Sequence, residues 1–362
     1  MTSEAPAVAT AEEIASRRIF RLVLGVTLSL VFSQAVNWPL SFIAPVFTLV
    51  ILGLPVPVPS FKAGIKFVLA LLIPVYVGTV VLIPLFEHVR WAGILMVILA
   101  LFGSFYYSAR GGSMIMGMFM TVGLTLIIAI GSVSIDALLG VIAGLGLGAI
   151  SGVVFVWLAH AFLPDLPTEP MKLSKKPKEL PSIKTARRSA LRSLIVVLPM
   201  VIFFLFSSSS TSYVAVMIKV ASMGQQANTD ISRKMGRLQL ESTLWGGLAA
   251  IIAWQVMSIW PSLLMYGLLI ALAGLLFGPR IFVGKGMHPK ASMWSYAFLT
   301  MIIVLAPALL DGQTSDGASS AFYSRLLLFI IIAIYGSVSI AVFDAFWPFK
   351  QDSTTPVQAE TK

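Results

Sequence analysis

Runs of about 18 apolar residues recur along the whole chain, and they constrain the fold more than any other feature. A bilayer core about 30 Å thick needs about 20 apolar residues in a spanning α-helix. Charged residues make up only 11% of the chain, whereas soluble domains carry about 25%. The mean hydropathy is +0.93. The sequence therefore predicts an all-α membrane protein that crosses the bilayer many times.

We expect about twelve transmembrane helices in two sets of six. The first half is predicted to span the membrane at about 19–37, 39–54, 66–86, 91–108, 113–131 and 137–161. The second half is predicted to span it at about 193–209, 212–226, 239–259, 261–278, 293–310 and 326–347.

The distribution of basic residues predicts the orientation of the chain. With the N-terminus inside, 22 of the 25 lysines and arginines fall on the cytoplasmic side, as the positive-inside rule requires. The predicted organisation is a cytoplasmic tail (1–16), a six-helix half (17–163), a basic cytoplasmic linker (164–190), a second six-helix half (191–348) and a cytoplasmic tail (349–362). The net charge of +10 is thus a topology signal, and no nucleic-acid partner is expected.

Short sequence similarities in the same order indicate that the two halves are repeats. RRIFR at 17–21 precedes the first half and RRSALR at 187–192 the second, while SMIMGMFMT at 113–121 resembles SMWSYAFLT at 292–300. FLP at 162–164 and FWP at 346–348 close the two halves. Six spans is an even number, so the repeats are expected to be parallel and related by an axis along the membrane normal.

The second span of each half is short or broken, which is the best sequence pointer to a transporter site. In the second half it contains Lys219, although a lysine at membrane depth costs several kcal/mol. Ser212, Lys219 and Gln226 share one helical face, and Ser222 lies close to it. We interpret this face as lining a substrate cavity. The alternative is a structural lysine that snorkels or pairs with an acid.

The stretches around these short spans resemble the fusaric acid resistance and aromatic acid exporter (FUSC) superfamily. The resemblance rests on SFIAPVFTLVILGLP, SYVAVMIKVASMG, RKMGRLQLESTLWGG (233–247) and SRLLLFIIIAIYGSVSIAVFDAFWP (324–348), and it covers about residues 17–348. It implies an efflux transporter for small organic, including aromatic, acids in the bacterial inner membrane. It further implies proton-driven transport and a periplasmic membrane-fusion adaptor as partner.

The same six-helix half is similar to the plant aluminium-activated malate transporter family, so a passive organic-anion channel stays open. A non-transporting scaffold of an envelope complex is a third alternative. The exporters carry a large cytoplasmic domain between their halves, which this chain lacks. Membrane lipid, a small organic anion and a homo-oligomeric copy of the chain are the other partners considered.

The remaining candidate residues have narrower roles. Arg325 opens the last span at the outer face and could attract a substrate anion or anchor the helix. Glu241, which could pair with Arg237, and Asp136 are weak candidates for proton coupling. Four glycines in the sixth span form a small-residue ridge for helix packing: Gly140, Gly144, Gly148 and Gly152.

The sequence lacks the features that mark catalytic or cofactor-binding proteins. The three histidines have no metal-ligand spacing, and the chain contains no cysteine. No nucleophile–base pair, phosphate loop or paired carboxylate is found. We therefore expect no metal, no cofactor and no enzymatic activity.

Overall fold

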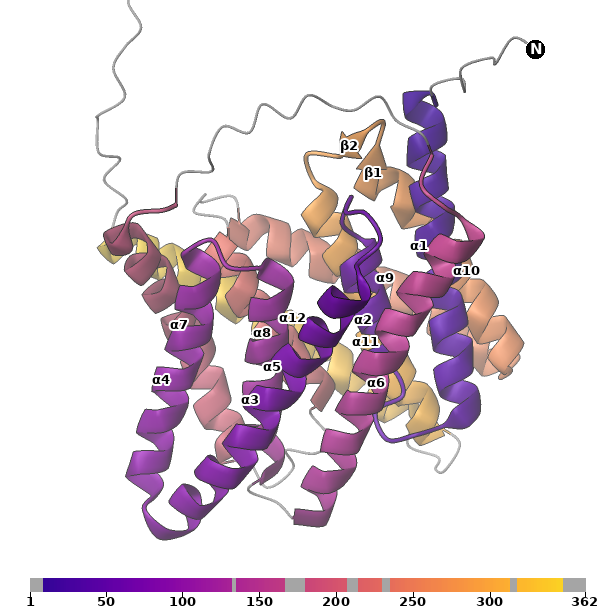
Figure 1. Ribbon diagram of the computed structural model, residues 1–362. Helices are drawn as coiled ribbons and strands as arrows, with labels where there is room; N and C mark the ends of the chain where they lie inside the picture. Colours follow the sequence, from indigo (N-terminus) through magenta and orange to yellow (C-terminus); the bar gives the residue numbers. More distant parts are fainter. Residues whose placement is uncertain are drawn as a thin grey trace, which may run out of the picture.

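The computed structural model describes residues 9–131, 135–166, 180–206, 214–229, 235–312 and 318–347. These residues form twelve helices and one two-stranded hairpin (Figure 1). The first six helices are α1 (Ala11–Val36), α2 (Ile43–Leu52), α3 (Phe61–His88), α4 (Arg90–Ala109), α5 (Met114–Gly131) and α6 (Ile135–Phe162). The other elements are α7 (Ile183–Leu205), α8 (Val214–Thr229), α9 (Met235–Ile259), α10 (Leu263–Ile281), β1 (Phe282–Val283), β2 (Gly286–Met287), α11 (Ala291–Gly312) and α12 (Ala318–Phe346).

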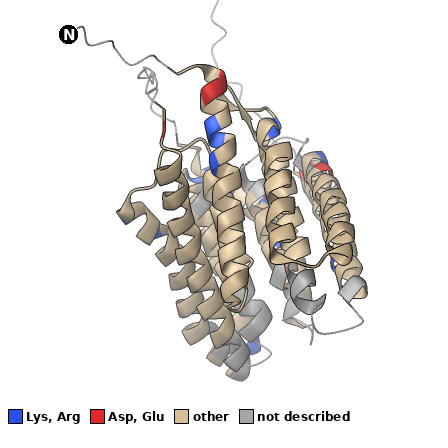
Figure 2. Ribbon diagram, turned by 90° about the vertical axis from the view of Figure 1, so that its right-hand side faces the viewer, with Lys and Arg blue, Asp and Glu red and all other residues tan. Residues whose placement is uncertain are grey.

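The helices have the length and polarity of membrane spans. Seven contain segments long and apolar enough to cross a bilayer within the described residues, namely α1, α3, α4, α6, α9, α10 and α12. Large apolar side chains such as Leu95, Leu99 and Leu264 are exposed on them, as on helices that face lipid. Figure 2 shows long stretches of helix without charged residues. The expectation of an all-α, multi-pass membrane protein is confirmed.

Several helices begin earlier than the apolar runs indicated, and two of them reach into the predicted tail and linker. α1 starts at Ala11, within the predicted tail, because Thr10 and Glu13 form a capping box that satisfies two N-terminal amides. α7 starts at Ile183, within the predicted linker, and Ser182 accepts a hydrogen bond from the amide of Thr185. Capping extends both helices beyond the apolar core into polar sequence.

Ion pairs join the first and last helices of each half at one end of the bundle, which we call the basic end. Arg21 of α1 contacts Asp165, just beyond α6, at 2.8 Å. Arg192 of α7 contacts Asp344 of α12 at 2.5 Å. Backbone carbonyls next to these acids accept further hydrogen bonds, from Arg17 and Arg21 in the first case and from Arg188 in the second. Both contacts put a cation beside a helix C-terminus, where the helix dipole favours it.

One helix of each half packs against the first helix of the other half: α10 against α1, and α4 against α7. α1 packs against α2 and α6, and α7 packs against α8 and α12. However, α1 also packs extensively against α10, and α4 packs against α7, side by side in Figure 1. α5 contacts α8, and α11 contacts α2. The chain from α1 to α6 is therefore interlocked with the chain from α7 to α12.

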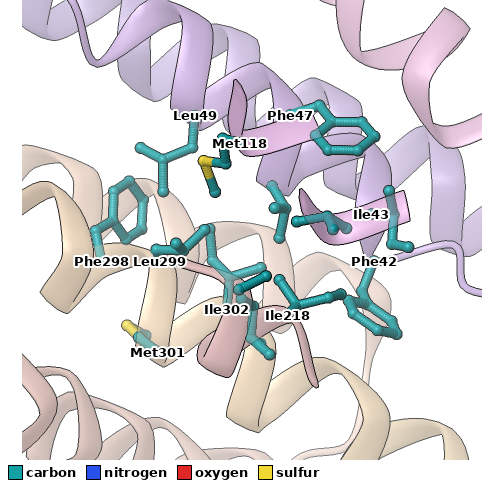
Figure 3. Packing of buried hydrophobic residues seen from close by; sticks show 14 of the residues in the cluster. Phe42, Ile43, Phe47, Leu49, Met118, Ile218, Phe298, Leu299, Met301 and Ile302 are labelled. Carbon is teal, nitrogen blue, oxygen red and sulfur yellow. The ribbon is translucent and has the colours of Figure 1, made fainter. Parts of the chain in front are cut away.

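The two short helices lie at the centre of the molecule. Nine of the ten residues of α2 are buried, and so are residues 216–225 of α8. α2 is short because Asn37 ends α1 with a positive φ of 53° and Gly53 and Pro55 stop the next helix. Figure 3 shows side chains of α2, α5, α8 and α11 gathered into one apolar cluster, among them Phe47, Met118, Ile218 and Leu299.

Candidate functional site

Lys219 lies at the middle of α8 and is only 1% exposed. Its Nζ donates a hydrogen bond to Thr300 Oγ1 of α11 at 3.0 Å. Within the described part of the chain, no carboxylate lies within ion-pair distance of it. An ammonium group held by one hydroxyl in an apolar interior is costly, so such residues mark functional sites in membrane proteins.

Besides the contact of Lys219 with α11, a polar contact joins α8 to α5 of the first half. Gln225 donates from Nε2 to Thr121 Oγ1 of α5 at 2.8 Å, and Thr121 also contacts Ser104 of α4 at 2.8 Å. Lys219 and Gln225 are six positions apart and so point to different sides of α8. The short helix is thus attached to α5 on one side and to α11 on the other, through one threonine of each.

Sequence reasoning missed Thr121, Thr300 and Gln225. The two threonines end the similar stretches at 113–121 and 292–300, so that similarity carried a signal for them. Gln225 stands beside the predicted Gln226, and a shift of one residue turns a helical side chain by about 100°. The predicted polar face of α8 therefore did not include Gln225.

α9 adds buried polar groups to the same region. Gln239, Ser242 and Thr243 are all buried. Both hydroxyls donate to the backbone carbonyl of Gln239, whereas the side-chain amide of Gln239 has no hydrogen-bond partner in the described residues. A Cβ added at Gly336 of α12 would lie 3.2 Å from Gln239 Nε2 and would collide with Met223 of α8. Gln239 is thus near α8 and α12 and has donor and acceptor capacity to spare.

A cavity of about 340 Å³ lies between α2 and α11. Its lining is mostly apolar and includes Leu49, Leu54, Met118 and Leu299, with the Met287–Pro289 segment before α11. Leu299 is adjacent in sequence to Thr300, the partner of Lys219. Cavities of roughly 300–1,000 Å³ with a few polar groups are typical of small-molecule sites.

The other predicted substrate residues are only partly described. Ser222 is buried, and its hydroxyl donates to the carbonyl of Lys219 at 2.8 Å. Arg325 is half-buried near the start of α12. Gln226 belongs to α8, but its side chain lies outside the described residues, and Ser212 lies outside them entirely.

The two residues predicted for proton coupling lie away from Lys219 as far as they are described. Glu241 contacts Arg237 at 3.0 Å and Lys290 at 3.1 Å, so it is a carboxylate shared by two exposed cations. Asp136 belongs to the first turn of α6, and its side chain lies outside the described residues. Neither observation brings a carboxylate to the buried lysine.

Two members of the glycine ridge of α6 face α2, and a third faces the segment just before α2. A Cβ at Gly148 would lie 2.9 Å from Ile43 Cγ2, and one at Gly152 would lie 2.9 Å from Phe47 Cβ. A Cβ at Gly144 would collide with the carbonyl of Pro39. Gly140 is different, because no heavy atom lies within 4 Å of the position of its Cβ.

Comparison with known proteins reaches the first half only. Residues 18–159 match the family described as Protein of unknown function (DUF2955). The DUF2955 match includes α2 and ends before α8, so it covers neither Lys219 nor Thr300. No curated protein and no solved structure matches the chain. The described residues contain no group of three potential metal ligands.

Proposed function

We propose that this protein is a transporter of small organic anions, with aromatic acids as the expected class. The observation that carries the proposal is the buried Lys219, which meets a threonine but no carboxylate in the described residues. A carboxylate ligand would supply the missing counter-charge. The apolar cavity is lined by Leu299, the residue before Thr300 in α11, and its volume suits the aromatic ring of a small acid.

We also propose that the chain is duplicated as two parallel six-helix repeats, an arrangement that suits a transporter. The helix contacts recur after a shift of six: α3 with α5 and α9 with α11, α2 with α6 and α8 with α12, α4 with α7 and α10 with α1. A gapless alignment of residues 41–53 with 212–224 matches serine, alanine and glycine at the first, fourth and last positions. It places Thr48 of α2 opposite Lys219 of α8.

The exchange of threonine for lysine makes one central helix different from the other. Thr48 is buried, and its hydroxyl donates to the carbonyl of Ala44 within its own helix. It therefore needs no external partner, whereas a lysine does. A substrate bound between the halves would meet one neutral and one cationic short helix, which favours a single anion in one orientation.

We further propose that the membrane is the bacterial inner membrane, with both termini cytoplasmic. The basic end would then face the cytoplasm, as the positive-inside rule expects. The cavity between α2 and α11 lies beside the loops of this end, since Leu54 follows α2 and His288 precedes α11. This arrangement suits uptake of substrate from the cytoplasm and export through a periplasmic adaptor.

Flux measurements in proteoliposomes test the proposal. Purified protein is given benzoate, a hydroxybenzoate, malate and uncharged benzyl alcohol, with and without an imposed pH gradient. We expect flux of the aromatic acids that depends on the gradient and no protein-dependent flux of the alcohol. Anion flux that ignores the gradient would favour the channel. Absence of any anion flux would exclude transport and leave the scaffold.

A further inference from the structure

A pocket of about 240 Å³ at the basic end is lined by three arginines from one helix. Arg17, Arg18 and Arg21 of α1 face it together with Asp165 and the loop segment 55–57. Three cations and one acid leave the lining with an excess of two positive charges. The pocket is separate from the apolar cavity between α2 and α11, so an inference about it does not depend on transport.

The arginines are held in position, but most of their donors stay free. Arg17 Nε donates to the carbonyl of Pro164 at 3.1 Å, and Arg18 Nη1 donates to that of Lys285 at 2.9 Å. Arg21 is only 4% exposed and is fixed by Leu163 and Asp165. Each guanidinium carries five N–H groups. In the described structure, Arg17 and Arg18 each use one of theirs in a hydrogen bond, which leaves further donors around the pocket.

The contact between α1 and the end of α6 does not require an arginine at position 18. The alignment of 41–53 with 212–224 has an offset of 171 residues. The same offset pairs Arg17 and Arg21 with Arg188 and Arg192, which contact the end of α12. Arg18 is then paired with Ser189. Two arginines and one aspartate therefore make the contact in the second half, where the third arginine, Arg187, is exposed.

We propose that this pocket binds a phosphate group. Converging guanidinium forks suit the oxygens of a phosphate, which accepts several charge-assisted hydrogen bonds at once. In the orientation proposed above, the pocket faces the cytoplasmic leaflet, which presents such groups as anionic lipid headgroups. Phe20 lies next to the arginines on α1 and is 55% exposed, which gives an acyl chain an apolar surface below the headgroup. A soluble phosphate offers the same chemistry without the chain.

Thermal unfolding of the whole protein in neutral detergent distinguishes the two sources. The protein is titrated with phosphatidylglycerol, with phosphatidylcholine and with inorganic phosphate. We expect phosphatidylglycerol to raise the unfolding temperature and Arg18→Gln to weaken its apparent affinity about tenfold, the loss of roughly one charged hydrogen bond. Arg18→Lys should restore part of the effect. Arg187→Gln removes an exposed cation near Ser189 and should leave the affinity unchanged.

Each result has one meaning. Protection by inorganic phosphate that is equally sensitive to Arg18→Gln supports the site and makes the ligand soluble. Protection by phosphatidylglycerol alone supports it and makes the ligand a lipid. The proposal is overturned if neither phosphatidylglycerol nor inorganic phosphate raises the unfolding temperature. It is also overturned if Arg18→Gln and Arg187→Gln weaken this protection equally. If Arg18→Gln fails to fold, the same comparison is made with Arg17→Gln.

Discussion

At the scale of single residues, Lys219 separates a binding function from a structural one. Its side chain is as buried as the phenylalanines around it, yet it ends in an amine and makes one hydrogen bond to a hydroxyl. Thr300 does not need the lysine, because a threonine hydroxyl in a helix can turn to a backbone carbonyl in its own helix. The lysine is therefore the group whose removal is informative.

We expect Lys219→Met to fold at least as well as the wild type and to bind organic anions more weakly. Replacing a buried charged group by an apolar one of similar volume is often neutral or stabilising. Loss of the cation should raise the half-saturating concentration of benzoate about tenfold or more, roughly 1.4 kcal/mol. Proteoliposome flux and thermal unfolding give the two quantities.

Thr300→Val is the matched control, since it removes the hydroxyl and keeps the charge. It should change anion affinity less than Lys219→Met does. Wild-type flux for every tested anion in Lys219→Met would assign the lysine to structure alone.

The buried and exposed ion pairs of the basic end should differ in their contribution to stability. Asp344→Asn leaves the buried Arg192 without its carboxylate, and breaking such a pair costs roughly 3–5 kcal/mol. Glu241→Gln acts on a carboxylate that faces two exposed cations, where each pair is worth about 1 kcal/mol or less. Thermal unfolding of both variants in one detergent makes the comparison. Equal shifts would contradict the assignment of Arg192 to a buried fastening.

These residues also show how far sequence could lead. Lys219 was found because a charge in an apolar run is conspicuous, and the pairing of Arg237 with Glu241 follows from helical spacing. The contact between Lys219 and Thr300 was beyond reach, because the two residues are 81 positions apart and only the packing of α8 on α11 joins them. Gln239 was missed because a polar residue near a span end is usually solvated, and its burial depends on the packing of neighbouring helices.

At the scale of elements, the contact between α6 and α2 depends on small residues. Gly148 and Gly152 let the backbone of α6 approach Ile43 and Phe47, as small residues do between membrane helices. Gly140 has the same spacing in sequence but open space beside it. Periodicity alone could not separate it from the others, since that depends on where α2 begins.

Gly148→Leu should therefore destabilise the protein, whereas Gly140→Leu should not. Overpacking a close contact costs typically 1–3 kcal/mol. We expect a lower yield of monodisperse protein and a lower unfolding temperature for the first variant only, as measured by size-exclusion chromatography and thermal unfolding. A Gly148→Leu protein with normal stability and altered substrate preference would assign the ridge to the transport pathway.

At the scale of the whole molecule, the apolar periodicity predicted the twelve helices that the described residues form and located each of them. It missed the start of α12 and those of α1 and α7, where capping residues extend helices into polar sequence. It also missed the β1–β2 hairpin, whose strands have two residues each. It gave no sign that α4 and α10 pack across the halves. That arrangement depends on side-chain fit between distant segments, which a hydropathy pattern does not contain.

The charge distribution gives a prediction for the whole chain. Reporter fusions at residues 175 and 355 should both give cytoplasmic signals, because 22 of the 25 basic residues would otherwise lie outside. A reporter that is active only in the cytoplasm and one that is active only in the periplasm should give opposite answers at each position. A periplasmic signal at only one position would mean an odd number of crossings between the two, and periplasmic signals at both would contradict the proposed orientation.

The interlocking of α1 with α10 also sets an order of events during synthesis. α1 is made first, but the helix that packs most extensively against it begins only at Leu263. Until about three quarters of the chain has left the ribosome, the side of α1 that α10 will cover must rest against lipid or an insertion factor. The complete first half therefore cannot exist as a finished unit before the second is nearly made, and a chain broken after α9 would display a vacant surface that quality-control proteases can recognise.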